Sequence, residues 1–75
     1  GLTGAAFNAA KERALDAFIA GEIGFMDMAR VVCVTLDKMS ARDGLQNATM
    51  TLDTVLDIDR LARIRAGEAI KMTGH

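Results

Sequence analysis

Residues 8–29 read NAAKERALDAFIAGEIGFMDMA, and this stretch decides how the rest of the chain is organised. Its first part has the pattern of an amphipathic helix, because apolar residues recur at the three- and four-residue spacing of one helix face. Gly21 is expected to end that helix, since glycine readily adopts the left-handed conformation found after helix C-termini. A second apolar pattern follows Asp27, a residue type that caps helix starts well. The stretch therefore predicts two helices joined by a short turn.

The first predicted helix spans about residues 5–20, and Thr3 is the candidate cap at its start. Its predicted inner face sets small alanines between two aromatic residues: Phe7, Ala10, Ala14, Ala17 and Phe18. Small side chains let a second helix come near, so we expect a close helix–helix contact along this face. In the turn at residues 21–26, Ile23 and Phe25 alternate with polar or small residues, which predicts a turn held against the core.

The second predicted helix spans about residues 27–40. Its inner stripe is Met28, Val31, Val32, Leu36 and Met39. Ala29 and Cys33 would widen that stripe well beyond 100° of the helix surface, so the pattern predicts the most buried helix of the set.

The second half of the chain opens with the polar segment SARDGLQNAT at residues 40–49, which predicts a linker with a turn at Asp43-Gly44. Thr51 is the expected cap of a short helix over residues 51–57. The apolar phase slips near residues 57–59, which predicts a break there and a last helix over residues 60–72 capped by Asp59. The fold expected from residues 1–75 is a single all-α domain, a compact helical bundle of three to four segments.

The composition excludes several classes of protein. Of the 75 residues, 51% are hydrophobic, and the formal net charge is −1, so the chain is suited to a core and unlike a disordered segment. The single Cys33 excludes an internal disulfide framework. No apolar run reaches the roughly 18–20 residues that span a bilayer, and no signal peptide is expected. Because the sequence starts at Gly and not at Met, we expect a piece of a longer polypeptide.

The candidate catalytic and metal-binding residues are few. Glu12 and Asp16 lie one helical turn apart, as an acid–base pair or a carboxylate metal site would, but the same spacing describes any solvated helix face. A di-metal bundle needs histidines on inward faces, and the single histidine is His75 at the end of the chain. Cys33 has no histidine nearby in sequence and is interpreted as a small core residue.

Phosphate and nucleic-acid sites are also poorly supported. The segment Gly21-Glu22-Ile23-Gly24 precedes a helix but follows no strand, unlike a dinucleotide-binding loop. Four basic residues, Arg60, Arg63, Arg65 and Lys71, give the last helix a basic character, but no aromatic residue lies there and the chain is slightly acidic. A helix-turn-helix over residues 5–39 would need a polar recognition helix, and the second helix is too apolar. We therefore expect no nucleic-acid partner and no membrane partner.

Several segments together resemble the C-terminal helical domain of 1-deoxy-D-xylulose 5-phosphate reductoisomerase. They are residues 8–12 (NAAKE), Ala17-Phe18, residues 23–29 (IGFMDMA), residues 52–59 (LDTVLDID), Ala62-Arg63 and residues 66–70. The family characteristically has N-A-A-N-E leading into a helix, then I-x-F-x-D-I, in this order and spacing. Lys11 replaces the second asparagine, Arg13 replaces an apolar residue, and residues 40–49 have no close counterpart.

The resemblance implies a three-domain enzyme of the non-mevalonate isoprenoid pathway, in which this domain supports the catalytic core. Such a parent would be a cytoplasmic (or, in plants, plastid) homodimer that uses NADPH and Mg or Mn. Its nucleotide, metal and substrate residues would lie in the two other domains, which would be the partners of this one. None of the family's catalytic motifs falls on this sequence, so the predicted catalytic, cofactor-binding and metal residues here are none, and the 75 residues alone are expected to be inactive.

The alternative is a free-standing helical protein–protein interaction module. Its binding face would be the Met- and Val-rich stripe of the second helix. Several hundred upstream residues with a nucleotide-binding fold would favour the reductoisomerase, whereas an initiator codon directly before Gly1 would favour the module.

Overall fold

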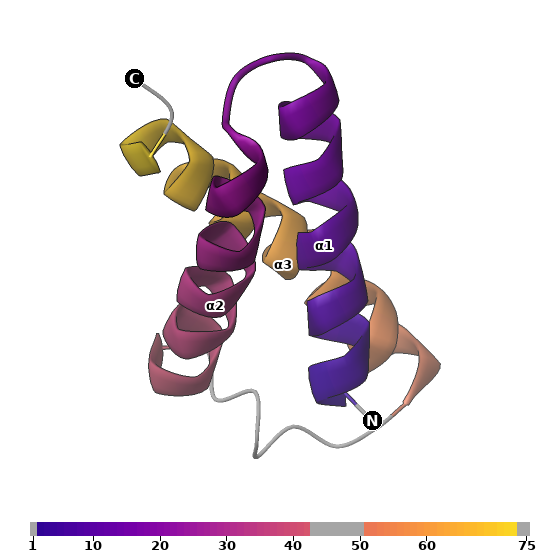
Figure 1. Cartoon of the computed structure of the whole chain (residues 1–75). Helices are drawn as coiled ribbons and strands as arrows, with labels where there is room; N and C mark the ends of the chain where they lie inside the picture. Colours follow the sequence, from indigo (N-terminus) through magenta and orange to yellow (C-terminus); the bar gives the residue numbers. More distant parts are fainter. Residues whose placement is uncertain (1, 43–50, 74–75) are drawn as a thin grey trace.

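Three helices make up the part of the chain that the structure, a computed structural model, describes: residues 2–42 and 51–73, without the side chain of Arg42. They are α1 (Leu2–Ile19), α2 (Phe25–Arg42) and α3 (Leu52–Thr73). α1 and α2 lie side by side, joined by a short turn, and α3 crosses behind both (Figure 1). All three pairs of helices are in contact, and the described residues contain no strand. The prediction of an all-α helical bundle is confirmed.

α1 begins earlier than predicted and buries a different face. Leu2 is buried in the core, so the helix starts there, and Thr3 lies inside it instead of capping it. The predicted alanines are buried, and Ala6 and Ala9 join them, but Phe7 and Phe18 are partly exposed, which corrects the predicted inner face. Apart from Leu2, the buried face consists of alanines, whose small side chains allow α3 to pack closely on α1.

The turn between α1 and α2 is fixed by backbone hydrogen bonds. Gly21 has φ +79°, and the amides of Gly21 and Glu22 donate to the carbonyls of Phe18 and Ala17, at 3.0 and 2.8 Å. This double pattern is a Schellman motif, so the prediction that Gly21 ends the first helix is confirmed. Ile23 is buried and holds the turn to the core, as predicted.

The start of α2 differs from the prediction. The helix begins at Phe25, so Asp27 lies in its first turn and is not the cap. Asp27 instead accepts a hydrogen bond from the Gly24 amide through Oδ2, at 2.9 Å, so a carboxylate still satisfies an otherwise free amide at the helix start. Phe25 is 68% exposed, contrary to its predicted place against the core, and its ring makes an edge-to-face contact with the ring of Phe18.

We expect Gly21→Ala to lower the free energy of unfolding by about 1–2 kcal/mol, because a Cβ strains a residue held at positive φ. The space around Gly21 is open, so the strain is conformational and not steric. Gly67→Ala is the matched control: Gly67 lies inside α3 with no atom near an added Cβ, and alanine there should stabilise by about 0.4–1 kcal/mol. Urea unfolding followed by circular dichroism measures both. Equal effects of the same sign would contradict this account of the turn.

α2 has the predicted stripe but not its predicted width. Val31, Val32 and Met39 are buried, with Met28 and Leu36 partly buried beside them. Ala29 and Cys33 are exposed, so Cys33 is not a core residue and α2 is not the most buried helix; α1 has the longer set of buried positions. The cause is that no described helix covers this flank of α2. Thr35, which the pattern did not select, is fully buried, and its Oγ1 donates to the Val31 carbonyl at 2.7 Å.

α3 is one continuous helix, so the predicted break at residues 57–59 is wrong. Thr51 does cap its start: the Thr54 amide donates to Thr51 Oγ1 at 3.1 Å. Asp59 is not a cap but lies mid-helix. The helix continues because its buried positions, Ile58, Ala62, Ala66, Ala69 and Ile70, keep one phase, whereas Leu52 and Leu56, which suggested the other phase, are exposed. The predicted linker is partly wrong as well, since residues 40–42 belong to α2; residues 43–49 lie outside the described residues.

The core consists of two adjoining clusters. One lies toward the α1–α2 turn and contains Ala10, Ala14, Ala17, Ile23, Val31, Val32, Ala66, Ala69 and Ile70. The other lies toward the start of α1 and contains Leu2, Ala6, Ala9, Met39, Ile58 and Ala62. Leu36 packs on both clusters and connects them. Alanines of α1 thus face alanines of α3, whereas larger side chains come mainly from α2.

Candidate functional site

The charged side chains of α3 are engaged mainly in ion pairs. Arg63 donates from Nη2 to Glu12 Oε1 of α1 at 2.6 Å and from Nε to Asp59 Oδ2 at 3.0 Å. Arg65 pairs with Glu68 at 3.2 Å, and Arg60 approaches Asp57 at 3.8 Å. These carboxylates offset the basic character that the sequence suggested for the last helix. A nucleic-acid interface would instead present its cations together and unopposed.

Arg63 of α3 binds Glu12 of α1 and so links the two helices. Glu12, one of the two candidate acid–base residues, is therefore part of an ion pair. The hydrogen bonds that Arg63 donates to Asp59 and, second in size, to Glu12 raise the pKa of Arg63 above its ordinary value. When folding raises the pKa of a cationic group, that group stabilises the folded state at pH values below its unfolded-state pKa. This stabilisation is lost only when the pH rises through the folded-state pKa. For an arginine this loss falls in strongly alkaline solution. Arg63 should therefore stay charged near neutral pH, so its protonation does not change the stability of the ion pair there.

A double-mutant cycle on Glu12→Gln and Arg63→Gln should give a coupling free energy of about 0.2–1 kcal/mol, the range for exposed pairs. Both side chains are partly solvated, which limits the value. Asp57 and Arg60 provide the control pair, because they are more exposed and 3.8 Å apart; their coupling should be near zero. Chemical unfolding at low and high salt measures both cycles, and the larger coupling should weaken with salt. Equal coupling in the two pairs would contradict the interhelical link.

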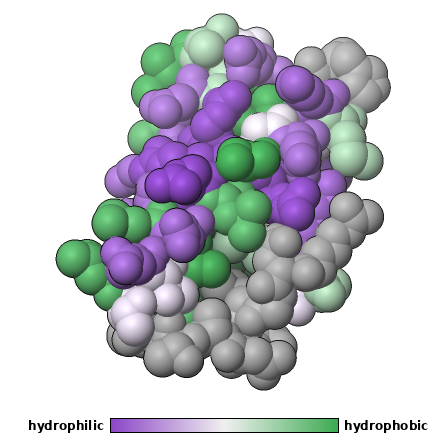
Figure 2. Space-filling model, turned by 180° about the vertical axis from the view of Figure 1, so that it is seen from behind, coloured by the Kyte–Doolittle hydropathy of each residue, from purple (hydrophilic) through white to green (hydrophobic). Residues whose placement is uncertain are grey.

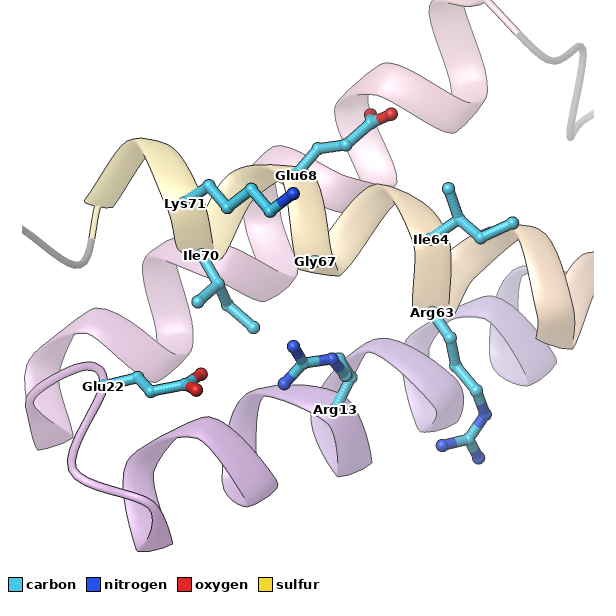
Figure 3. Close-up of a pocket in the computed structure, with 8 residues that line it drawn as sticks. All are labelled: Arg13, Glu22, Arg63, Ile64, Gly67, Glu68, Ile70 and Lys71. Atoms are coloured by element: carbon cyan, nitrogen blue, oxygen red, sulfur yellow. The ribbon is translucent and has the colours of Figure 1, made fainter.

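A charged hollow of about 600 Å³ lies between α1 and α3. Its lining residues are Arg13, Glu22, Arg63, Ile64, Gly67, Glu68, Ile70 and Lys71. Figure 3 shows Arg13 and Glu22 extending toward one another near Ile70, with Lys71 reaching along α3 toward Glu68. The hollow mixes both signs of charge, and its charged side chains are partly or fully exposed to solvent. These groups lack the burial that would tune them for proton transfer.

A second hollow of about 560 Å³ lies between α1 and α2, and we call it the apolar groove. Its lining residues are Phe7, Lys11, Glu12, Ala14, Leu15, Met28, Ala29, Val32 and Cys33. Most are apolar; Lys11 holds its amine 5.9 Å from the centre of the Phe7 ring, and Glu12 is bound to Arg63. On the side of the molecule opposite to the view of Figure 1, hydrophilic side chains cover much of the upper half, and hydrophobic ones lie in the centre and toward the lower left (Figure 2).

The sequence did not identify this groove, because it assigned Phe7 to the core of α1 and Cys33 to the core of α2. The signal was present, since both helices have more apolar residues than one face can hold. Asp16, the second acid–base candidate, is exposed on α1 and does not line either hollow. His75 lies outside the described residues.

Residues 2–42 and 51–73 contain neither a cluster of metal ligands nor a membrane-spanning helix. Within them, no three His, Cys, Asp or Glu side chains come together as a metal site would require. Within the same ranges, no helix has an apolar window long enough to cross a bilayer. The turn at Gly21–Gly24 uses its amides for helix capping, so they are not turned toward a phosphate.

Comparison with known proteins finds similarity to one enzyme family. Residues 1–65 match the profile of the DXP reductoisomerase C-terminal domain. The chain is 61% identical over 70 residues to a 1-deoxy-D-xylulose 5-phosphate reductoisomerase of Ruegeria pomeroyi, covering 93% of this chain and 18% of that protein. The same enzyme of Jannaschia is 57% identical over 63 residues (84% and 16%), and that of Agrobacterium fabrum 49% over 70 residues (93% and 17%). The chain thus spans less than a fifth of these relatives. No solved structure gives a significant match.

Proposed function

The chain belongs to the DXP reductoisomerase C-terminal domain family, and from this membership we propose that it is the structural helical domain of an NADPH-dependent 1-deoxy-D-xylulose 5-phosphate reductoisomerase. In this proposal the whole enzyme acts in isoprenoid biosynthesis. The domain supports the catalytic core, and the reacting groups belong to the other domains of the same polypeptide. The single observation that carries the proposal is the match of residues 1–65 to this domain family.

The chemistry of the described side chains supports a structural role. Reduction by NADPH needs a dinucleotide site, and a metal-assisted isomerisation needs a cluster of oxygen or nitrogen ligands. The described residues do not fit either group, because their carboxylates are in ion pairs, in a helix cap or singly exposed. We therefore assign NADPH and Mg²⁺ or Mn²⁺ to the remaining domains, and derive no step of the reaction from this one.

The test is turnover by the whole enzyme and by the isolated domain. The full-length polypeptide that carries this domain is expected to oxidise NADPH when given 1-deoxy-D-xylulose 5-phosphate and Mg²⁺ or Mn²⁺. The 75-residue chain alone should give none, because its described residues bring together no cluster of metal ligands. Turnover by the isolated chain would overturn the structural role, and absence of turnover by the full-length polypeptide would overturn the proposed enzyme.

The alternative, a free-standing interaction module, draws support from the apolar groove and only in part from the stripe on which it was first based. Val31 and Met39 of that stripe are fully buried in the core and cannot contact a partner, whereas Met28 and Val32 line the groove. A reading frame in which these residues are preceded directly by an initiator codon would favour the module. One with an upstream nucleotide-binding fold favours the reductoisomerase.

A further inference from the structure

The charged hollow between α1 and α3 brings together two cations that have no ion pair with another described residue. Arg13 comes from α1 and Lys71 from α3, and both line the hollow. Arg63, the third cation of the lining, is offset by Glu12 and Asp59. Arg13 is only partly exposed, and Figure 3 shows its guanidinium in the space between the two helices. The hollow therefore presents positive charge that the described residues leave unbalanced.

The two carboxylates of the hollow reduce this charge but do not cancel it. Glu68 is bound to Arg65 at 3.2 Å, so it is not available to the cations of the hollow. Glu22 extends toward Arg13 from the turn after α1, yet the two form no ion pair (Figure 3). Among the groups that are not offset, Arg13 and Lys71 thus stand against Glu22 alone. Positive charge in a hollow raises the local concentration of anions.

Gly67 leaves the α3 wall of the hollow open. It lies inside α3 without a positive φ, and no atom lies within 4 Å of a Cβ added to it. Neither the backbone conformation nor packing against a neighbour therefore requires glycine, although glycine is less favourable than alanine in a helix interior. A residue that weakens its own helix and keeps a charged hollow open is expected where a ligand binds.

The size and the lining of the hollow describe a small organic anion. Its volume of about 600 Å³ is within the range of small-molecule sites. Arg13 offers a fork of N–H donors that matches a phosphate or a carboxylate, and Lys71 adds a second positive charge. Ile64 and Ile70 provide apolar surface for a carbon skeleton. The Glu22 carboxylate can accept a hydrogen bond from a hydroxyl or amino group of the same molecule.

We propose that the charged hollow binds a small organic anion, whose phosphate or carboxylate group contacts Arg13 and Lys71 and whose hydroxyl or amino group donates to Glu22. Binding is non-covalent. The site goes beyond the proposed function and does not depend on it, because it uses no group of the reaction. Since its contacts come from α1, from the turn after α1 and from α3, the ligand holds these elements together and slows their separation.

Hydrogen–deuterium exchange of α3 in the full-length polypeptide tests the proposal, with inorganic phosphate and acetate as the probes. A bound anion slows exchange through local opening by the factor 1 + [L]/Kd. For a Kd of about 5 mM and about 50 mM probe, the amides of residues 61–73 should exchange about tenfold more slowly than in sodium chloride of equal ionic strength. Stronger protection by phosphate identifies a phosphate ligand, and stronger protection by acetate a carboxylate ligand. Equal exchange in all three salts would overturn the proposal.

Charge variants separate a bound anion from a general effect of salt. Arg13→Gln and Lys71→Gln should each remove most of the protection, because a long polar side chain remains and only the cation is lost. Arg60→Gln is the matched control, since Arg60 also lies on α3 but does not line the hollow, and it should keep the protection. Each variant is compared with itself in sodium chloride, so changes in its own stability cancel. Protection that persists without Arg13 or Lys71 would contradict the assigned contacts.

A shape variant tests the place of binding without changing any charge. Gly67→Leu should fill the hollow and abolish the protection by the probes, while leucine, a good helix former, should not weaken α3 in sodium chloride. Gly4→Leu is its control, because Gly4 lies in α1, also has open space beside it and does not line the hollow. Equal protection of the two leucine variants by phosphate or acetate would mean that the anion binds elsewhere, and would overturn the proposal.

Discussion

Replacing Met39 by alanine is expected to lower the free energy of unfolding by about 2–5 kcal/mol, the range for truncating large core residues. Met39 is fully buried and is the largest such side chain among the described residues. It packs in the cluster formed with Leu2, Ala6, Ala9, Ile58 and Ala62. The short alanine side chains there cannot reach into the space that Met39 would leave, so a cavity should remain. The loss is large for a domain of this size, whose total stability is expected to be about 4–11 kcal/mol.

Met26→Ala is the matched control for Met39→Ala, because Met26 lies in the same helix and is 82% exposed. Its effect should stay within about 0.5 kcal/mol. Urea unfolding monitored at the helix band of the circular dichroism spectrum measures both variants under the same conditions. If the two methionines had equal effects, the second core cluster would not have the packing described above.

Ala66→Leu should be the second most damaging change, lowering the free energy of unfolding by about 1–3 kcal/mol through overpacking. Ala66 is fully buried in the cluster where α3 meets Ala10, Ala14 and Ala17 of α1. Three added carbons cannot fit between two helices that approach through alanines, so α1 and α3 must move apart. Separation would also lengthen the bond from Arg63 to Glu12, which spans the same two helices.

Ala41→Leu provides the comparison for Ala66→Leu, since Ala41 is an exposed helical residue of α2. Leucine and alanine are both good helix formers, so the control should change stability by less than about 0.5 kcal/mol. Thermal and chemical unfolding of the two variants test the difference. A tolerant Ala66 would mean that α1 and α3 are not closely packed.

At the candidate site, the sequence alone did not show which side chains of different helices meet. It proposed no metal-binding or phosphate-binding site, and it set Glu12 and Asp16 aside as a solvated face. The structure adds that Glu12 is bound to Arg63, a partner 51 positions away that no local pattern connects with it. It also brings Phe7 and Cys33, which lie on different helices and were both assigned to the core, to the same groove.

The sequence by itself determined that the fold is all-α, where Gly21 ends the first helix and that Thr51 caps the start of a helix. These features depend on bonds and periodicities within a few residues, so local chemistry is sufficient to predict them. Only the tertiary structure decided which side of each helix is buried. Phe7 and Ala6 are both apolar, and the close approach of α3 selects the smaller one for the core. The same contact keeps α3 continuous through Asp59, because its buried alanines stay in phase with those of α1 across the whole interface.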